Sequence, residues 1–144
     1  MRDISSTGLP PGRMPQIRVP ATPAVSNKGG NIFGGWIMSQ VDIAGSIPAE
    51  MRACGRIVTR AVTSFEFKKP VFVGDLLSCY AEIVSEGRTS MSVFVEVYVQ
   101  RVKEGAIECI KVTEATVVYV AIDREGRPRP LPPPPGKSAT ATDT

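Results

Sequence analysis

The fold is decided by residues 33–47, which read FGGWIMSQVDIAGSI. Their apolar side chains recur at helical spacing on two stripes, so the segment predicts one buried helix from Gly34 to about Ala53. Asn31 is the expected N-cap of this helix. Pro48 is expected to kink the helix or to end its regular part near Ile47, because proline lacks the N–H that an inner helical turn requires.

After this helix the hydrophobic period changes from about 3.6 residues to 2, as it does where strands begin. Turn signals separate four predicted strands, which we expect to be antiparallel neighbours, at about 56–68, 76–86, 89–102 and 106–123. A short edge strand is expected at 16–20, because Pro20 excludes an inner strand. One buried helix and one long antiparallel sheet predict an α+β fold, in which a curved sheet wraps a single central helix.

The amino-acid composition limits which partners, catalytic groups and metal sites the protein can have. The 17 Lys and Arg residues against 14 Asp and Glu residues leave a net charge of +3 without a basic run, so nucleic acid is not an expected partner. The chain has no histidine, which excludes histidine-based nucleophile systems and histidine-ligated zinc. The three cysteines form no CxxC pair, which argues against a sulfur metal site and fits a reducing, cytoplasmic location.

The length of 144 residues predicts one folded domain, at 15–126. Prolines punctuate both ends, so 1–14 and 127–144 are expected to be extended or disordered, the second as a proline-rich tail. No stretch approaches about 18 uninterrupted apolar residues, so membrane insertion is not expected.

Asp42 is the only charged residue between Gly29 and Ala49. A carboxylate on so apolar a helix is costly unless it is partnered or used. The alternative is an aspartate that hydrogen bonds a nearby amide or reaches the surface.

Gly34 and Gly35 begin the helix and expose backbone N–H groups at its positive end, where an oxyanion or a polarised carbonyl can bind. The alternative is close packing of the helix entry against the sheet. Eight helical residues separate Gly34 from Asp42, a distance of about 12 Å, which is too far for both to act on one carbon. If both do, they belong to different subunits, with two helices antiparallel across a twofold axis.

Four segments together resemble the YciA-type acyl-CoA thioesterases of the hotdog-fold superfamily. They are NKGGNIFGGWIMSQVD at 27–42, GRIVT at 55–59, FKKPVFVGD at 67–75 and GRTS at 87–90, and the resemblance covers about residues 16–123. It implies a hotdog domain that hydrolyses acyl-coenzyme A to a free acid and coenzyme A. It also implies a site at a dimer interface, within a tetramer or a hexamer.

The resemblance also implies roles for particular residues. Asp42 becomes the catalytic carboxylate, and Gly34 or Gly35 supplies the polarising N–H. Asn27 holds the water or the thioester through its side-chain amide, and the Ser46 hydroxyl orients water. Coenzyme A is part of the substrate and product, so neither a cofactor nor a metal is implied.

Coenzyme A carries phosphates, which require cations and hydroxyls at the mouth of the site. The resemblance places nucleotide contacts at Arg88, Thr89 and Ser90, in a predicted hairpin loop. Lys68 and Lys69 precede Pro70 in another exposed loop and are further candidates.

Rival interpretations remain open at this point. The carboxylates that compete with Asp42 are Glu66, Glu96 and Glu114. Asp42 itself can act as a general base or as a nucleophile. A non-catalytic acyl-CoA-binding module, regulatory or scaffolding, is the alternative function, and a dehydratase or hydratase on the same fold is disfavoured by the missing histidine.

Overall fold

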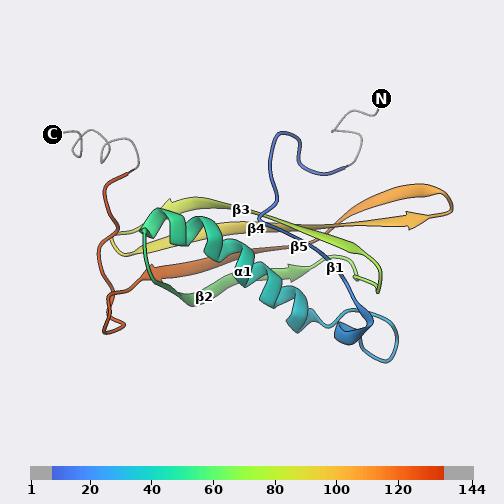
Figure 1. Ribbon diagram of the computed structural model, residues 1–144, viewed down its shortest axis with the longest axis horizontal. Helices are drawn as coiled ribbons and strands as arrows, with labels where there is room; N and C mark the ends of the chain where they lie inside the picture. The colour runs from blue at the N-terminus through green and yellow to red at the C-terminus, as the bar shows by residue number, and fades with distance from the viewer. Residues whose placement is uncertain (1–7, 135–144) are drawn as a thin grey trace.

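The computed structural model describes residues 8–134, in which one long helix crosses one face of a five-stranded sheet (Figure 1). The elements, in chain order, are β1 (Ile17–Pro20), the 3-10 helix η2 (Pro23–Val25), α1 (Gly34–Ala53), β2 (Ile57–Phe67), β3 (Leu76–Glu86), β4 (Ser90–Lys103) and β5 (Ala106–Ala121). Every strand pairing is antiparallel, and the strand order is β1-β3-β4-β5-β2. The predicted α+β architecture, with one long helix on a long antiparallel sheet, is confirmed.

Strand bounds agree with the sequence patterns to within two residues, but one neighbour relation was wrong. Strand β2 pairs with β5, so β4 and β5 lie between β2 and β3. The segment 68–75 therefore crosses the end of the sheet instead of forming a hairpin. Its eight residues can span about 26 Å, which exceeds the roughly 14 Å that three strand spacings require.

The predicted bounds of α1 are confirmed, but its N-cap differs from the expectation. Phe33 is the N-cap, with an extended backbone and no side-chain cap, so the assignment of Asn31 was wrong. The Asn31 N–H donates to Asn27 Oδ1 at 3.1 Å. The helix continues through Pro48 to Ala53, so of the two outcomes expected at Pro48, a kink or an end of the regular part near Ile47, the second was wrong. Burial of the last turns against the sheet offsets the hydrogen bond that proline removes.

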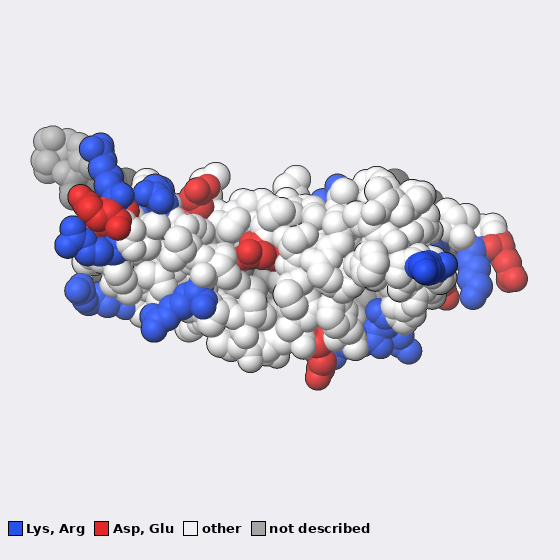
Figure 2. All heavy atoms as spheres, turned by 90° about the horizontal axis from the view of Figure 1, so that it is seen from below, with Lys and Arg blue, Asp and Glu red and all other residues white. Residues whose placement is uncertain are grey.

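One face of α1 is buried against the sheet, through Ile37, Val41, Ala44, Gly45, Ala49 and Ala53. The expected burial all round the helix was wrong for a single chain, because Met38 and Ile43 are 42% and 52% exposed. On the neighbouring strand β2, Val58 and Val62 are exposed as well. Figure 2, viewed from the side of β2, shows a surface with few charges across its middle and most Lys and Arg side chains near its ends.

The terminal segments lie against the body where the structure describes them. Arg13 pairs with Glu96 at 3.1 Å and lies over the ring of Tyr80, on the sheet face away from α1. Near the other end, the Leu131 N–H donates to the Arg88 carbonyl at 2.9 Å. The remaining parts of the expected terminal segments, 1–7 and 135–144, lie outside the described residues.

Candidate active site

Asp42 lies midway along α1 and its carboxylate is held by a neighbouring strand. The Thr59 hydroxyl, on β2, donates to Asp42 Oδ1 at 2.7 Å. Both residues line a pocket of about 300 Å³, together with Gly35 and with the apolar side chains of Met38 and Phe65. The pocket therefore places a charged, hydrogen-bonded carboxylate beside apolar walls, which suit an acyl chain.

The start of α1 offers two N–H donors to a ligand. The N–H groups of Trp36 and Ile37 both donate to the Phe33 carbonyl. Those of Gly34 and Gly35 have no partner among residues 8–134, because Phe33 has no side-chain oxygen with which to cap the helix. Unpaired N–H groups at the positive end of a helix stabilise a developing oxyanion.

A second pocket, of about 420 Å³, lies at this helix start and is lined by Asn27, Gly34, Phe67, Lys68 and Lys69. Asn27 Oδ1 accepts the Gly29 N–H at 2.9 Å as well as the Asn31 N–H, which braces the loop. The side-chain NH₂ of Asn27 has no partner among the described residues, so it remains able to donate to a ligand.

Gly34 and Asp42 line different pockets of one chain. Their separation along the helix is about 12 Å, as the spacing predicted. A single chain therefore does not bring the N–H of Gly34 and the carboxylate of Asp42 to one reacting carbon.

Ser46 lies one turn beyond Asp42 on α1. Its hydroxyl donates to the Ile43 carbonyl at 2.6 Å, a local bond within the helix. A water-orienting role requires the hydroxyl to leave this bond, so the role of Ser46 stays a prediction.

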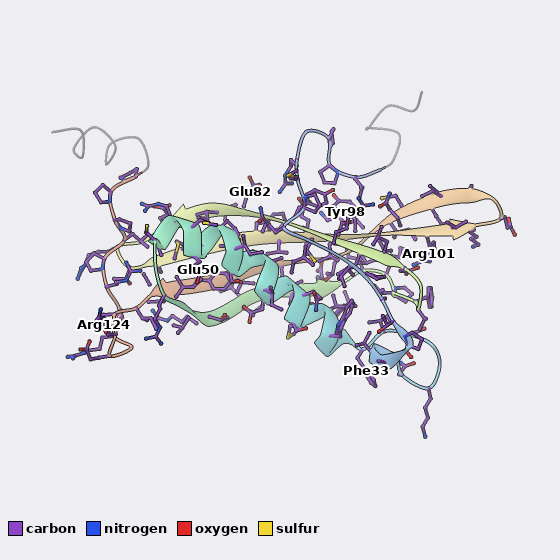
Figure 3. All side chains as sticks on the ribbon, viewed as in Figure 1. Phe33, Glu50, Glu82, Tyr98, Arg101 and Arg124 are labelled. Atoms are coloured by element: carbon purple, nitrogen blue, oxygen red, sulfur yellow. The ribbon has the colours of Figure 1, made fainter. Side chains whose placement is uncertain are left out.

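The candidate phosphate-binding residues lie near opposite ends of α1, which Phe33 and Glu50 mark in Figure 3. Lys68 and Lys69 line the pocket near Phe33. The turn Arg88–Ser90 lies near the other end, where Arg52 on the last turn of α1 pairs with Glu86 at 2.8 Å. A helix of this length spans about 30 Å, so one chain keeps the two groups apart.

Lys68 and Lys69 also differ in their partners. Lys68 Nζ pairs with Glu114 at 2.9 Å and with Glu66 at 3.2 Å. Hydrogen bonds to Glu114 and Glu66 raise the pKa of Lys68. Lys69 makes no ion pair among the described residues, which leaves it the better placed of the two for a phosphate.

The rival carboxylates form a row across three strands. Glu96 pairs directly with Glu114, and Glu114 with Glu66. Lys111 lies between the first two, at 2.8 Å from Glu96 and 3.4 Å from Glu114. Burial opposes ionisation of Glu96, but hydrogen bonds from Lys111 and an arginine lower its pKa overall. Cations therefore neutralise all three glutamates, and none lines the pocket of Asp42.

Thr59 is a site residue that sequence reasoning missed. It belongs to the GRIVT segment, but nothing in its spacing from Asp42 reveals a contact across 17 positions. The contact arises because β2 runs along α1, an arrangement that no local pattern in the sequence records.

No helix within residues 8–134 is long and apolar enough to cross a membrane. Within the same range, no three Asp, Glu or Cys side chains are grouped in a way that would hold a metal ion.

This chain is similar to several thioesterases. The acyl-CoA thioester hydrolase YciA of Escherichia coli is 50% identical over 114 residues, which cover 78% of this chain and 86% of that protein. A hexameric hotdog-fold thioesterase of Campylobacter jejuni is 47% identical, with a TM-score of 0.80, over 84% of this chain and 91% of that one.

An acyl-CoA hydrolase from Staphylococcus aureus, solved with butyryl coenzyme A and coenzyme A, is 28% identical. Its TM-score is 0.72, over 81% of this chain and 70% of that one. Structures of that enzyme with an aspartate or a threonine replaced by alanine are also known. The family model of the thioesterase superfamily matches residues 29–106. The chain thus belongs to the thioesterase superfamily, as a hotdog-fold member of the YciA-type acyl-CoA thioesterase family.

Proposed function

We propose that this protein hydrolyses acyl-coenzyme A to a free fatty or organic acid and coenzyme A, with Asp42 as the catalytic carboxylate. The observation that carries the proposal is the Thr59 hydroxyl bonded to the Asp42 carboxylate in a pocket with apolar walls. A protein that only binds acyl-CoA gains nothing from a partly buried carboxylate beside the thioester.

Relatives support this pair of residues. The aspartate and the threonine replaced in the Staphylococcus aureus hydrolase lie 17 positions apart, the same separation as Asp42 and Thr59.

The chemistry follows one of two balanced routes. As a general base, Asp42 Oδ2 takes a proton from water while the hydroxide attacks the thioester carbonyl, and the departing coenzyme A thiolate then takes up that proton. As a nucleophile, the carboxylate attacks the carbonyl itself, expels the coenzyme A thiolate and forms an anhydride; water then hydrolyses the anhydride, which regenerates the carboxylate, and the proton that this water loses goes to the thiolate. In both routes an oxyanion forms, and N–H groups such as those of Gly34 and Gly35 stabilise it.

The complete site belongs to two chains. Antiparallel packing of two α1 helices about a twofold axis brings Gly34 of one chain to Asp42 of the other. The exposed apolar side chains of Met38, Ile43 and Val62 would be covered by this packing. The Campylobacter jejuni relative is hexameric, so we favour three such dimers in a hexamer over a tetramer.

The same packing unites the two groups of phosphate-binding candidates. In antiparallel helices, the last turn of one α1 lies near the loop that precedes the other. Arg88, Thr89 and Ser90 of one chain then approach Asn27 and Lys69 of the other, and together they bind the nucleotide part of coenzyme A. Lys68 contributes less to phosphate binding, because its ammonium group is already paired with Glu66 and Glu114.

We place the enzyme in the cytoplasm. Cys54, Cys79 and Cys109 are all free thiols, as expected in a reducing compartment. Coenzyme A enters as substrate and leaves as product, and the proposed chemistry uses no cofactor.

The deciding experiment is hydrolysis of acyl-coenzyme A thioesters of increasing chain length, followed by detection of the released thiol. Wild-type protein should release coenzyme A, and Asp42→Asn should lower kcat by about 10² or more while the substrate still binds. Glu82→Gln, a change at an exposed position on β3, is the matched control. Binding without hydrolysis by the wild type would favour the regulatory or scaffolding alternative.

A further inference from the structure

Tyr119 makes a hydrogen bond to the turn of α1 that carries the proposed catalytic carboxylate. Its hydroxyl donates to the main-chain carbonyl of Asp42 at 2.6 Å. The side chain is 1% exposed and lies near the C-terminal end of β5. Because the other acceptor capacity of this carbonyl serves the helix itself, the tyrosine bond ties the sheet to one particular helical turn.

The two donors to Asp42 come from one cross-strand pair. Thr59 on β2 lies directly opposite Tyr119 on β5. Side chains of such a pair point to the same face of the sheet. Thr59 therefore holds the carboxylate of Asp42, and Tyr119 holds its main chain. Both hydrogen bonds to Asp42 therefore depend on the register between β2 and β5.

Helix α1 has a glycine, Gly45, where the side chain of Tyr119 approaches it. A Cβ atom at Gly45 would lie 2.5 Å from the Tyr119 hydroxyl oxygen and 3.2 Å from two of its ring carbons. Any side chain at Gly45 would thus displace the hydroxyl from the Asp42 carbonyl. The absence of a side chain at this position has a local reason, which is the approach of Tyr119 to the helix.

The hydroxyl is held in its donor form. Burial raises the pKa of Tyr119 above its ordinary value, and the negative charge of Asp42 raises it further.

We propose that Tyr119 is a positioning residue for hydrolysis: its bond to the Asp42 carbonyl, made possible by Gly45, fixes the helical turn so that the Asp42 carboxylate meets Thr59 and the thioester. This inference rests on the proposed function. Tyr119 does not touch the reacting atoms itself and acts through Asp42. Substrate affinity depends on other residues, namely the apolar pocket and the Arg88 loop, so loss of the bond affects turnover and not binding.

The test compares two tyrosines that are equally buried. Tyr119→Phe removes only the hydroxyl, while Tyr80→Phe removes one from the sheet face away from α1, and Tyr80 is 2% exposed. We expect Tyr119→Phe to lower kcat about tenfold with KM changed less than about twofold. Tyr80→Phe should leave both constants near the wild-type values, although the melting temperature falls slightly in both variants.

A second variant keeps the test decisive if Tyr119→Phe folds poorly. Gly45→Ala keeps the tyrosine and displaces its hydroxyl, so it should lower kcat to a similar extent. Combining Tyr119→Phe with Gly45→Ala should cost less than the product of the two losses, because the hydroxyl that clashes is gone.

Two results would overturn the inference. One is a kcat for Tyr119→Phe equal to that for Tyr80→Phe, and the other is a loss expressed entirely in KM. Both are read against an active wild type, whereas a wild type that hydrolyses no thioester would refute the proposed function instead.

Discussion

Thr59→Val tests the contact that defines the candidate site. Valine keeps the shape of threonine and removes the hydroxyl that donates to Asp42 Oδ1 at 2.7 Å. A hydrogen bond to a charged group contributes about 1.5 to 3 kcal/mol. Thr59 is exposed in the single chain, so the lower end of that range applies. Because 1.4 kcal/mol corresponds to a factor of ten in rate, kcat should fall about tenfold.

The assay is the release of coenzyme A from one good acyl-CoA substrate, with kcat and KM determined separately. Thr59→Ser should retain most of the activity, because it keeps the hydroxyl. Thr63→Val is the matched control, since Thr63 lies on the same strand and its hydroxyl makes only a 3.4 Å contact with a main-chain carbonyl. Equal kcat values for Thr59→Val and Thr63→Val would refute the reasoning.

Arg88→Ala should raise KM about tenfold with kcat nearly unchanged. Pantetheine thioesters, which lack the nucleotide phosphates, should show no such rise, and equal losses on both substrates would contradict a phosphate contact. Co-expression of Asp42→Asn with Gly34→Leu should restore activity that each lacks alone, and an active monomer in light scattering would exclude the shared site. Lys111→Met should lower the melting temperature by about 3 °C at pH 7. The pKa of Glu96 is lowered in the folded state, so the stabilisation by the Lys111–Glu96 pair is lost as pH falls through that pKa and Glu96 becomes protonated. The decrease in melting temperature caused by Lys111→Met should therefore shrink at low pH, and a decrease that does not depend on pH would contradict this account.

The helix and strands were predictable because their signals are local. Residues 34–53 carry a helical period and the later segments a period of two, and each pattern needs only neighbours along the chain. The isolated charge of Asp42 and the glycines at Gly34 and Gly35 stand out for the same reason. The GRTS segment adds information only through its resemblance to relatives.

Strand order and the regular course of the helix past Pro48 depended on contacts that no local pattern records. The connection 68–75 reads as a turn, yet it crosses the sheet end because β2 pairs with β5. Pro48 was expected to kink α1 or to end its regular part, yet burial of the following turns carries the helix on to Ala53. In both cases tertiary packing outweighed a local preference of a few kcal/mol.

The candidate carboxylate of Asp42 and the glycines that begin the helix stand out from residue type and spacing alone. The groups that surround them depend on how the chain folds. The pairing of Thr59 with Tyr119 across β2 and β5 places two hydrogen-bond donors against Asp42. The pairing of Glu66 with Glu114 places two carboxylates around the ammonium group of Lys68. These contacts join residues far apart in the chain, so they exist only once the strand register is set, and register follows from burying one face of the whole sheet.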